Sequence, residues 1–502
     1  MTEIPDQVPA PPPLKVDSEA ISAVLAEKSI TSSVLTHLLG WVGAFSIGGL
    51  MMALVLIGAR LATSEAGGLQ QIKIEQDMTG RMIYAAGPGG MNIDSSLLVP
   101  NLSQLKDGSL VSRLAYVILA SELDSPAAGL VELDSIHDEK ASGTITLTPE
   151  EQALLDDVSV LLFAAASGER ADALPEARAE SLRQSLGFFG KLLIAKSSGD
   201  QKALDDLSSS AVGGMVTLII AAVWFISFFL GGFASFIILG IFAAYGKLKL
   251  RFAVSGSTGS VYIETFAIWI GMFFLLQIIT EGLVAILGSG SLGAYIGPEF
   301  SMIISLIMMF VCLSALVWPM IRGVSSTRLL EDIGLGPVNI FKEIIPGFVT
   351  YAMGLPLLLV GLGLSAALGF VLNALFGEQP AASHPIQTLI GEGGWMTMVL
   401  IFLVACVGAP VTEEIMFRGV LYRYLRECSR TWALLLSVFF SMLVSSFIFA
   451  AVHPQGLTYI PVLGSLAVAF CIGREWRGSL VAPMIAHGVS NGVVLTMNFG
   501  LF

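Results

Sequence analysis

Three charged side chains interrupt an otherwise apolar stretch of the chain, at Glu413, Glu414 and Arg418. The residues upstream of them, from Trp395 to Pro410, carry no charge. A carboxylate within a membrane is costly unless it is paired or lines a wet cavity, so such residues mark functional sites. These three residues are therefore the first candidates for chemistry.

The spacing of the three charges predicts two different environments on one helix. Glu414 and Arg418 are four residues apart, so they share a helical face and can form an ion pair. Glu413 points about 100° away from Glu414 and faces a different neighbour. The sequence therefore predicts one paired carboxylate beside one that is left free.

Three more polar residues lie in later apolar runs. His453 ends the run that begins at Phe449, and His487 and Asn491 are spaced to lie on one helical face. Singly, each has a structural explanation, such as an interfacial histidine or a bond between helices. Together with the first three they could form a hydrolytic set. A glutamate can act as general base on water, a histidine can orient that water or hold a metal, and the remaining donors can bind an oxyanion.

The composition is that of a polytopic membrane protein. Of 502 residues, 54% are hydrophobic and 13% are charged, against about 25% charged residues in soluble domains. The net charge of -13 is concentrated in residues 64–210, which hold 22 acidic and 11 basic residues. An acidic segment of this kind argues against a nucleic-acid partner. All four cysteines lie in or beside apolar runs, so no disulfide framework or paired-cysteine zinc site is expected.

Nine apolar runs are long enough to be transmembrane helices. The run 213–245 is long enough for a hairpin, but the alternation of basic residues favours one span. The positive-inside rule then predicts a cytoplasmic N-terminus, an extracytoplasmic 64–210 and an outside C-terminus. The nine predicted spans are 35–62, 213–245, 259–287, 299–320, 347–376, 395–421, 432–452, 457–473 and 479–500.

The expected fold class is an all-α polytopic membrane protein with about nine transmembrane helices and a mostly helical or α+β extracytoplasmic domain inserted after the first helix. In that domain, 70–75 and 143–147 resemble strands, and helices are expected from 148 and over 175–195. The expected organisation is a disordered cytoplasmic tail at 1–34, a first transmembrane helix at 35–63, a soluble extracytoplasmic domain at 64–210, three transmembrane helices in 211–320, a cytoplasmic loop at 321–346 and a unit of five transmembrane helices at 347–502.

The polar motifs of the C-terminal unit, in their order, resemble a known family. Glu-Glu-x-x-x-Arg at 413–418, Phe-x-x-x-His at 449–453 and His-x-x-x-Asn at 487–491 are similar to the motifs of the CPBP intramembrane proteases. This family is also called the CAAX-protease and bacteriocin-processing (Abi) family, and it includes the Ras-converting CAAX endopeptidase. The resemblance covers roughly residues 330–500 and says nothing about the first four spans or the segment 64–210.

The resemblance implies hydrolysis of a peptide bond near the membrane. Glu413 and His453 would activate the attacking water, and His487 and Asn491 would stabilise the oxyanion. By the same carry-over, Glu414 and Arg418 would brace the site and could bind the substrate's carboxyl end.

The use of a metal is left open by the sequence. The family is labelled metalloprotease, although a glutamate-activated water without metal is an alternative, which the residues slightly favour. If zinc is present, Glu413, His453 and His487 would supply three ligands and leave one position open. The chain lacks the His-Glu-x-x-His helix that is usual in zinc proteases.

One geometric expectation counts against a simple model of the site. If the sixth and seventh spans form a regular hairpin that turns near 428–432, Glu413 lies opposite residue 447. His453 is then about 9 Å too far away, at 1.5 Å per residue. A tilt, a kink near Pro410 or a shifted turn would close this gap.

Two other functions fit the same residues. The chain could be a non-catalytic membrane scaffold or bacteriocin-immunity protein that keeps buried charges for helix registration. A proton-coupled transporter is a lesser alternative. For the protease, the expected substrate is a CAAX tail, a leader peptide or a membrane protein, and the expected location is a bacterial inner membrane. A partner of the acidic segment 64–210 is also expected.

Overall fold

The computed structural model describes residues 79–94, 98, 103–106, 108–168, 174–254, 256–288, 298–377, 394–453 and 455–501. Every regular element within these ranges is a helix, which confirms the expected all-α class. The predicted tail at 1–34, first span at 35–62 and strand at 70–75 lie outside the described residues.

The strand predicted at 143–147 is wrong. The chain turns at Gly143 with a φ of 75° and passes directly into α7 (Pro149–Ser167). A capping box starts this helix: Thr148 accepts a hydrogen bond from the backbone of Glu151, whose side chain accepts one from the backbone of Thr148. The segment thus leads into a helix and has no strand beside it in the described part of the chain.

The short helices found between Ser103 and Ser198 pack around one apolar core. The helix predicted over 175–195 is two helices, because Gly187 with a φ of 55° separates them. Leu114, Leu155 and Phe188 are buried in the shared core. Besides α7 the helices are α4 (Ser103–Lys106), α5 (Leu110–Leu123), α6 (Pro126–Ala141), α8 (Glu176–Leu186) and α9 (Phe188–Ser198).

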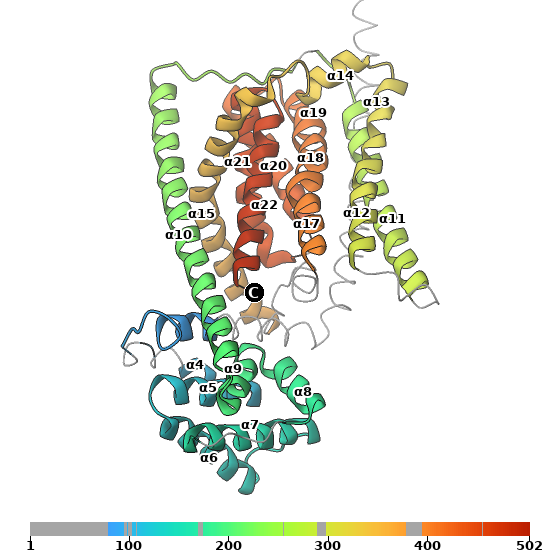
Figure 1. Cartoon of the computed structure of the whole chain (residues 1–502). Coiled ribbons are helices and arrows are strands. Elements are labelled where there is room, and N and C mark those ends of the chain that lie inside the picture. The colour runs from blue at the N-terminus through green and yellow to red at the C-terminus, as the bar shows by residue number, and fades with distance from the viewer. Residues whose placement is uncertain are drawn as a thin grey trace, which may run out of the picture.

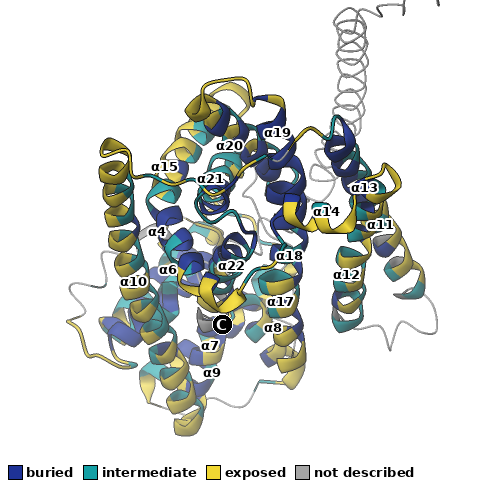
Figure 2. Ribbon diagram, turned by 90° about the horizontal axis from the view of Figure 1, so that it is seen from above, coloured by how far each residue is buried: buried dark blue, intermediate teal, exposed yellow. Residues whose placement is uncertain are grey.

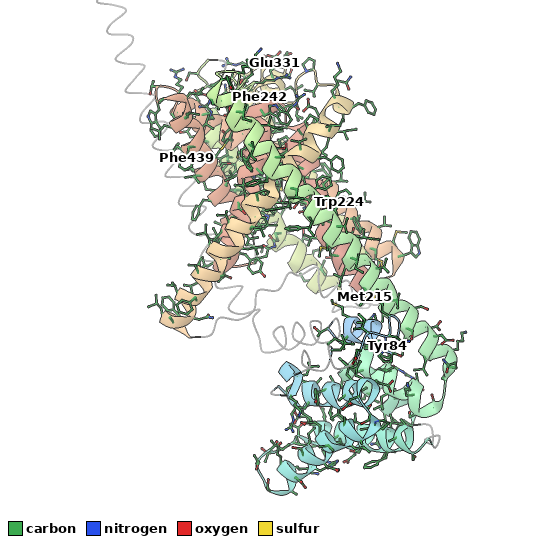
Figure 3. The ribbon with its side chains drawn as sticks, turned by 90° about the vertical axis from the view of Figure 1, so that its left-hand side faces the viewer. Tyr84, Met215, Trp224, Phe242, Glu331 and Phe439 are labelled. Atoms are coloured by element: carbon green, nitrogen blue, oxygen red, sulfur yellow. The ribbon has the colours of Figure 1, made fainter. Side chains whose placement is uncertain are left out.

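A single long helix joins this core to the bundle. Helix α10 runs without a break over Gln201–Ala244, about 66 Å at 1.5 Å per residue, so the alternative of a hairpin is excluded. Its start packs into the core of α4–α9 through Ala211. Further on it crosses α15 (Ile344–Phe376), which Figure 3 shows from the side.

The rest of the chain is a helical bundle (Figure 1). Seven described helical runs are long and apolar enough to cross a membrane, and Val481–Met497 is a shorter apolar helix. All eight spans predicted after the first coincide with helices, while the total of nine is not settled by the described residues. The remaining elements are α11 (Val261–Gly288), α12 (Pro298–Cys312), η3 (Leu313–Leu316), α13 (Val317–Ile321), α14 (Ser326–Ile333), η4 (Ile340–Glu343), α17 (Trp395–Leu403), η5 (Val404–Gly408), α18 (Ala409–Glu414), η6 (Ile415–Leu421), α19 (Tyr422–Cys428), α20 (Leu434–Ala451), η7 (Leu457–Tyr459), α21 (Ile460–Arg477) and α22 (Val481–Leu501).

Burial follows the expectation for a membrane protein. Figure 2 shows α18 and α19 largely buried and the outward face of α10 exposed. Apolar side chains on that face are exposed, such as Ile220 at 62% and Leu230 at 60% of their full surface. Lipid chains cover such residues at no cost, so the exposed apolar face supports an integral membrane protein.

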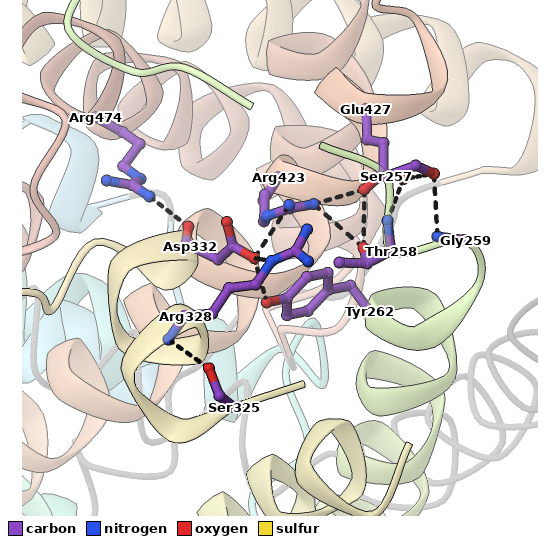
Figure 4. A network of polar contacts seen from close by, with 10 residues as sticks. All are labelled: Ser257, Thr258, Gly259, Tyr262, Ser325, Arg328, Asp332, Arg423, Glu427 and Arg474. Carbon is purple, nitrogen blue, oxygen red and sulfur yellow. Dashed lines mark hydrogen bonds and ion pairs between the residues drawn. The ribbon is translucent and has the colours of Figure 1, made fainter. Parts of the chain in front are cut away.

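A buried charge network anchors one end of the bundle (Figure 4). Arg423 lies 3.1 Å from Asp332 of α14 and 2.6 Å from Glu427. Asp332 also accepts a hydrogen bond from the Tyr262 hydroxyl at 2.9 Å, and Glu427 accepts from the backbone and hydroxyl of Thr258. The network fixes α19 to α11, to α14 and to the loop before α11.

Candidate active site

The helix that carries the first motif is not uniformly α-helical. From Trp395 to Cys428 the chain is one continuous helical run, but η5 (404–408) and η6 (415–421) are π-helical. They lie on either side of Glu413 and Glu414. A π-helical turn widens the helix, and such turns occur frequently at functional sites. Pro410, which cannot donate a backbone hydrogen bond, accounts for part of the irregularity.

The predicted ion pair between Glu414 and Arg418 is confirmed. Arg418 Nη1 donates to Glu414 Oε1 at 2.8 Å, and both side chains are fully buried. Arg418 Nη2 donates to the carbonyl oxygen of Ala467 at 3.1 Å. The guanidinium lies over the rings of Phe449 and Phe470, at 4.5 and 5.1 Å from their centroids. This enclosure favours bracing by Arg418 over contact with a substrate carboxylate.

Glu414 also binds the first histidine of the last motif. His487 Nδ1 lies 2.9 Å from the same Oε1 atom that Arg418 binds. The imidazole is buried on α22, where only 6% of its side chain is exposed. With Nδ1 held by Glu414, the opposite nitrogen of His487 is turned toward Glu413.

Glu413 is the free carboxylate that the spacing predicts. Its Oε2 atom lies 3.9 Å from Nε2 of His453 and 3.9 Å from Nε2 of His487. This oxygen is buried and makes no direct hydrogen bond. A separation of 3.9 Å is too long for a direct bond, while a bridging water can span up to about 5.6 Å with two 2.8 Å hydrogen bonds. A water that bridges Glu413 to either imidazole would satisfy this oxygen.

His453 reaches Glu413 despite the expected 9 Å gap. The rings of Phe417 and Phe449 are 5.1 Å apart, and Ser445 donates to the carbonyl oxygen of Phe417. This register places Glu413 nearly opposite Phe449. The His453 ring turns back toward that residue, with Nδ1 at 2.6 Å from the Phe449 carbonyl oxygen. The shifted register and the orientation of the His453 ring together close the expected gap.

Asn491 is held by the backbone of the first π-helical segment. Its Nδ2 atom donates to the carbonyl oxygen of Ala405 at 2.7 Å. On the same face of α22, a Cβ atom on Gly488 would stand 2.6 Å from the carbonyl oxygen of Cys406, so the two helices touch closely here. Asn491 thus fixes η5 against α22, and its donation to an oxyanion stays a prediction for its second amide hydrogen.

The residues predicted to hold zinc do not fit a zinc ion as their side chains stand. Tetrahedral zinc with ligand bonds of 2.0–2.1 Å places donor atoms about 3.3 Å apart. Both histidine nitrogens are 3.9 Å from the Glu413 oxygen. Among the described residues, no group of three or more histidine, cysteine or acidic side chains is arranged to hold a metal.

Sequence reasoning missed one aromatic residue in the site. Phe470 stacks on His487 with centroids 5.0 Å apart and an angle of 18° between the rings. It lies in the middle of an apolar run, where a phenylalanine is expected in any membrane helix. Only its contacts distinguish it from a lipid-facing residue, so no sequence signal could have found it.

The comparisons with known proteins concern this part of the chain. Residues 395–493 match the family model described as type II CAAX prenyl endopeptidase Rce1-like. The chain is 29% identical over 125 residues to the membrane-embedded CAAX protease MroQ of Staphylococcus aureus (strain USA300), a match that covers 25% of this chain and 49% of that relative. The chain thus spans about half the length of this curated relative. No solved structure matches the chain. All six candidate residues fall within 395–493, and the predicted resemblance to CAAX proteases is confirmed.

Proposed function

We propose that this chain, whose residues 395–493 match the Rce1-like CAAX endopeptidase family, is an intramembrane endopeptidase that uses Glu413 as general base. One observation carries the proposal. The buried, unbonded Oε2 atom of Glu413 is 3.9 Å from two imidazole nitrogens. A water bound among these atoms would have a base on one side and donors or acceptors on the other.

The reaction starts with proton transfer. Glu413 takes a proton from the water, and the water oxygen forms a bond to the carbonyl carbon of the substrate while the carbonyl electrons move to its oxygen. His453, held through Nδ1 by the Phe449 carbonyl, orients the water through Nε2. General-base catalysis of this kind contributes about 10²- to 10⁴-fold in rate.

The second step is collapse of the tetrahedral intermediate. The carbon–nitrogen bond breaks, and the proton on Glu413 passes to the leaving amine, so the products are a carboxylic acid and an amine. We assign His487 Nε2 as the donor to the developing oxyanion, because Nδ1 is held by Glu414 and Nε2 is turned toward Glu413. Donation from His487 Nε2 to the oxyanion requires a hydrogen on both ring nitrogens, because Nδ1 faces the Glu414 carboxylate. Preorganised donors to an oxyanion are each worth about 10²- to 10³-fold in kcat.

The substrate that we propose is a peptide or a membrane protein cleaved near the bilayer. CAAX-type tails and leader peptides are the two classes that the family suggests. We place the chain in a bacterial inner membrane with a cytoplasmic N-terminus, because basic residues concentrate at the end of the bundle that holds α14 and α19. In this orientation α4–α9 lie outside.

The test is a cleavage assay with the full-length protein in nanodiscs. Two quenched-fluorescent probes separate the substrate classes: a farnesylated peptide with a CAAX end and a peptide with an internal apolar segment. Glu413→Gln is expected to lower kcat by about 10²- to 10⁴-fold. The matched control is Glu331→Gln, because Glu331 is exposed on α14. A folded Glu413→Gln protein that cleaves at the wild-type rate would overturn the proposal.

A further inference from the structure

Phe470 contacts both side chains that bind Glu414, namely His487 and Arg418. Its ring lies flat against His487, with centroids 5.0 Å apart and 18° between the planes. The Arg418 guanidinium is 5.1 Å from the same ring centroid. Phe470 itself is almost fully buried on α21. No other ring lies face-on to His487 among the described residues, because Phe449 meets it edge-on at 5.8 Å and 76°.

We propose that Phe470 is a positioning residue that sets the plane of the His487 imidazole. The proposal rests on the proposed function, in which His487 Nε2 donates to the oxyanion. A single hydrogen bond from Nδ1 to Glu414 fixes one atom of the ring, while rotation about the terminal torsion of histidine is broad. A flat aromatic surface removes that rotation and holds Nε2 in the direction of Glu413.

Phe470 also keeps water away from the charged atoms. Arg418 and His487 both bind Oε1 of Glu414, and Phe449 and Phe470 enclose the guanidinium. An aromatic face attracts a nearby cation without competing for its hydrogen bonds.

The ring is supported from behind by other helices. Phe470 belongs to a cluster with Tyr351 and Leu355 of α15 and Ala486 of α22, against which Phe228 of α10 packs. Phe228 and Tyr351 are themselves 5.5 Å apart. Because this cluster comprises side chains from four helices, Phe470 cannot turn aside without repacking its neighbours. Its orientation is therefore a fixed part of the bundle.

The variant that tests the proposal is Phe470→Leu in the full-length protein. A leucine keeps the apolar contact and removes the flat face. We expect kcat to fall about 10- to 100-fold, as for a small displacement of a catalytic group, with KM nearly unchanged. Phe470→Met, which fills more of the volume without a ring, carries the same expectation if the leucine variant does not fold.

Phe266→Leu is the matched control. Phe266 of α11 is about as buried as Phe470, and its ring packs against that of Phe417 with centroids 5.4 Å apart. We expect this variant to unfold at a lower temperature while its kcat and KM stay near wild type. Equal losses of kcat in the two leucine variants would show that Phe470 is an ordinary core residue.

A double-mutant cycle separates positioning from packing. In a His487→Gln background, Phe470→Leu should have no further effect on kcat, because residues that act as a unit are not additive. Independent, multiplicative losses would overturn the proposal. The failure of the proposed function is distinguishable, because in that case Glu413→Gln alone would keep full activity.

Discussion

His487 Nδ1 and Glu414 Oε1 are 2.9 Å apart, although the two residues are 73 positions apart in the chain. The two adjacent glutamates therefore have different surroundings. Glu414 is fully buried and is bound by both Arg418 and His487. Glu413 makes no direct hydrogen bond at Oε2.

The two glutamates should therefore respond differently to the same substitution. Glu414→Gln leaves the buried Arg418 without its carboxylate, and loss of one partner of a buried pair costs about 3–5 kcal/mol. Glu413→Gln removes no direct bond at Oε2 and should leave stability within about 1 kcal/mol. Thermal unfolding in nanodiscs, followed by tryptophan fluorescence, measures both variants. Equal unfolding temperatures would contradict the division between the two residues.

Metal dependence is the next prediction. Because the Glu413, His453 and His487 donors are farther apart than zinc ligands, purified protein should contain far less than one zinc per chain. A chelator should leave the cleavage rate unchanged. Elemental analysis beside the cleavage assay checks this. Stoichiometric zinc that disappears in His453→Ala would show that the three side chains close around a metal.

The buried network at α14 predicts a stability effect without a catalytic one. Asp332→Ala deprives Arg423 of one of its two carboxylates, and Arg423 is almost fully buried. We expect a loss of about 3–5 kcal/mol. Activity per folded molecule should stay near wild type, because the network contacts neither histidine in the described structure. Loss of activity at full stability would instead place the network in the catalytic mechanism.

The parts of this structure that the sequence predicts are those that polarity reveals. Eight spans and six polar site residues stand out because a charge or an amide in an apolar run is rare. The π-helical turns around Glu413, the bond from Asn491 to Ala405 and the stack of Phe470 on His487 do not stand out. Each depends on which residue a distant helix brings near, and the apolar residues involved are interchangeable in a sequence. The break at Gly187 was missed for a related reason, since the apolar spacing continues across it.

The crossing of α10 and α15 predicts different effects of the same substitution at two adjacent glycines, Gly232 and Gly231. Gly232 is buried at this crossing, and a Cβ atom there would stand 1.9 Å from the carbonyl oxygen of Ala352. Because a backbone atom cannot turn aside as a side chain can, Gly232→Ala should separate the helices and cost about 1–3 kcal/mol. Nothing lies within 4 Å of the corresponding atom on Gly231, so Gly231→Ala should be neutral, or stabilising by about 0.5–1 kcal/mol through helix propensity. Thermal unfolding of the two variants measures the difference.

The Gly232 variant should lose activity as well, because α10 also packs behind Phe470 through Phe228. Two variants that are equally stable and equally active would show that the helices do not meet at Gly232.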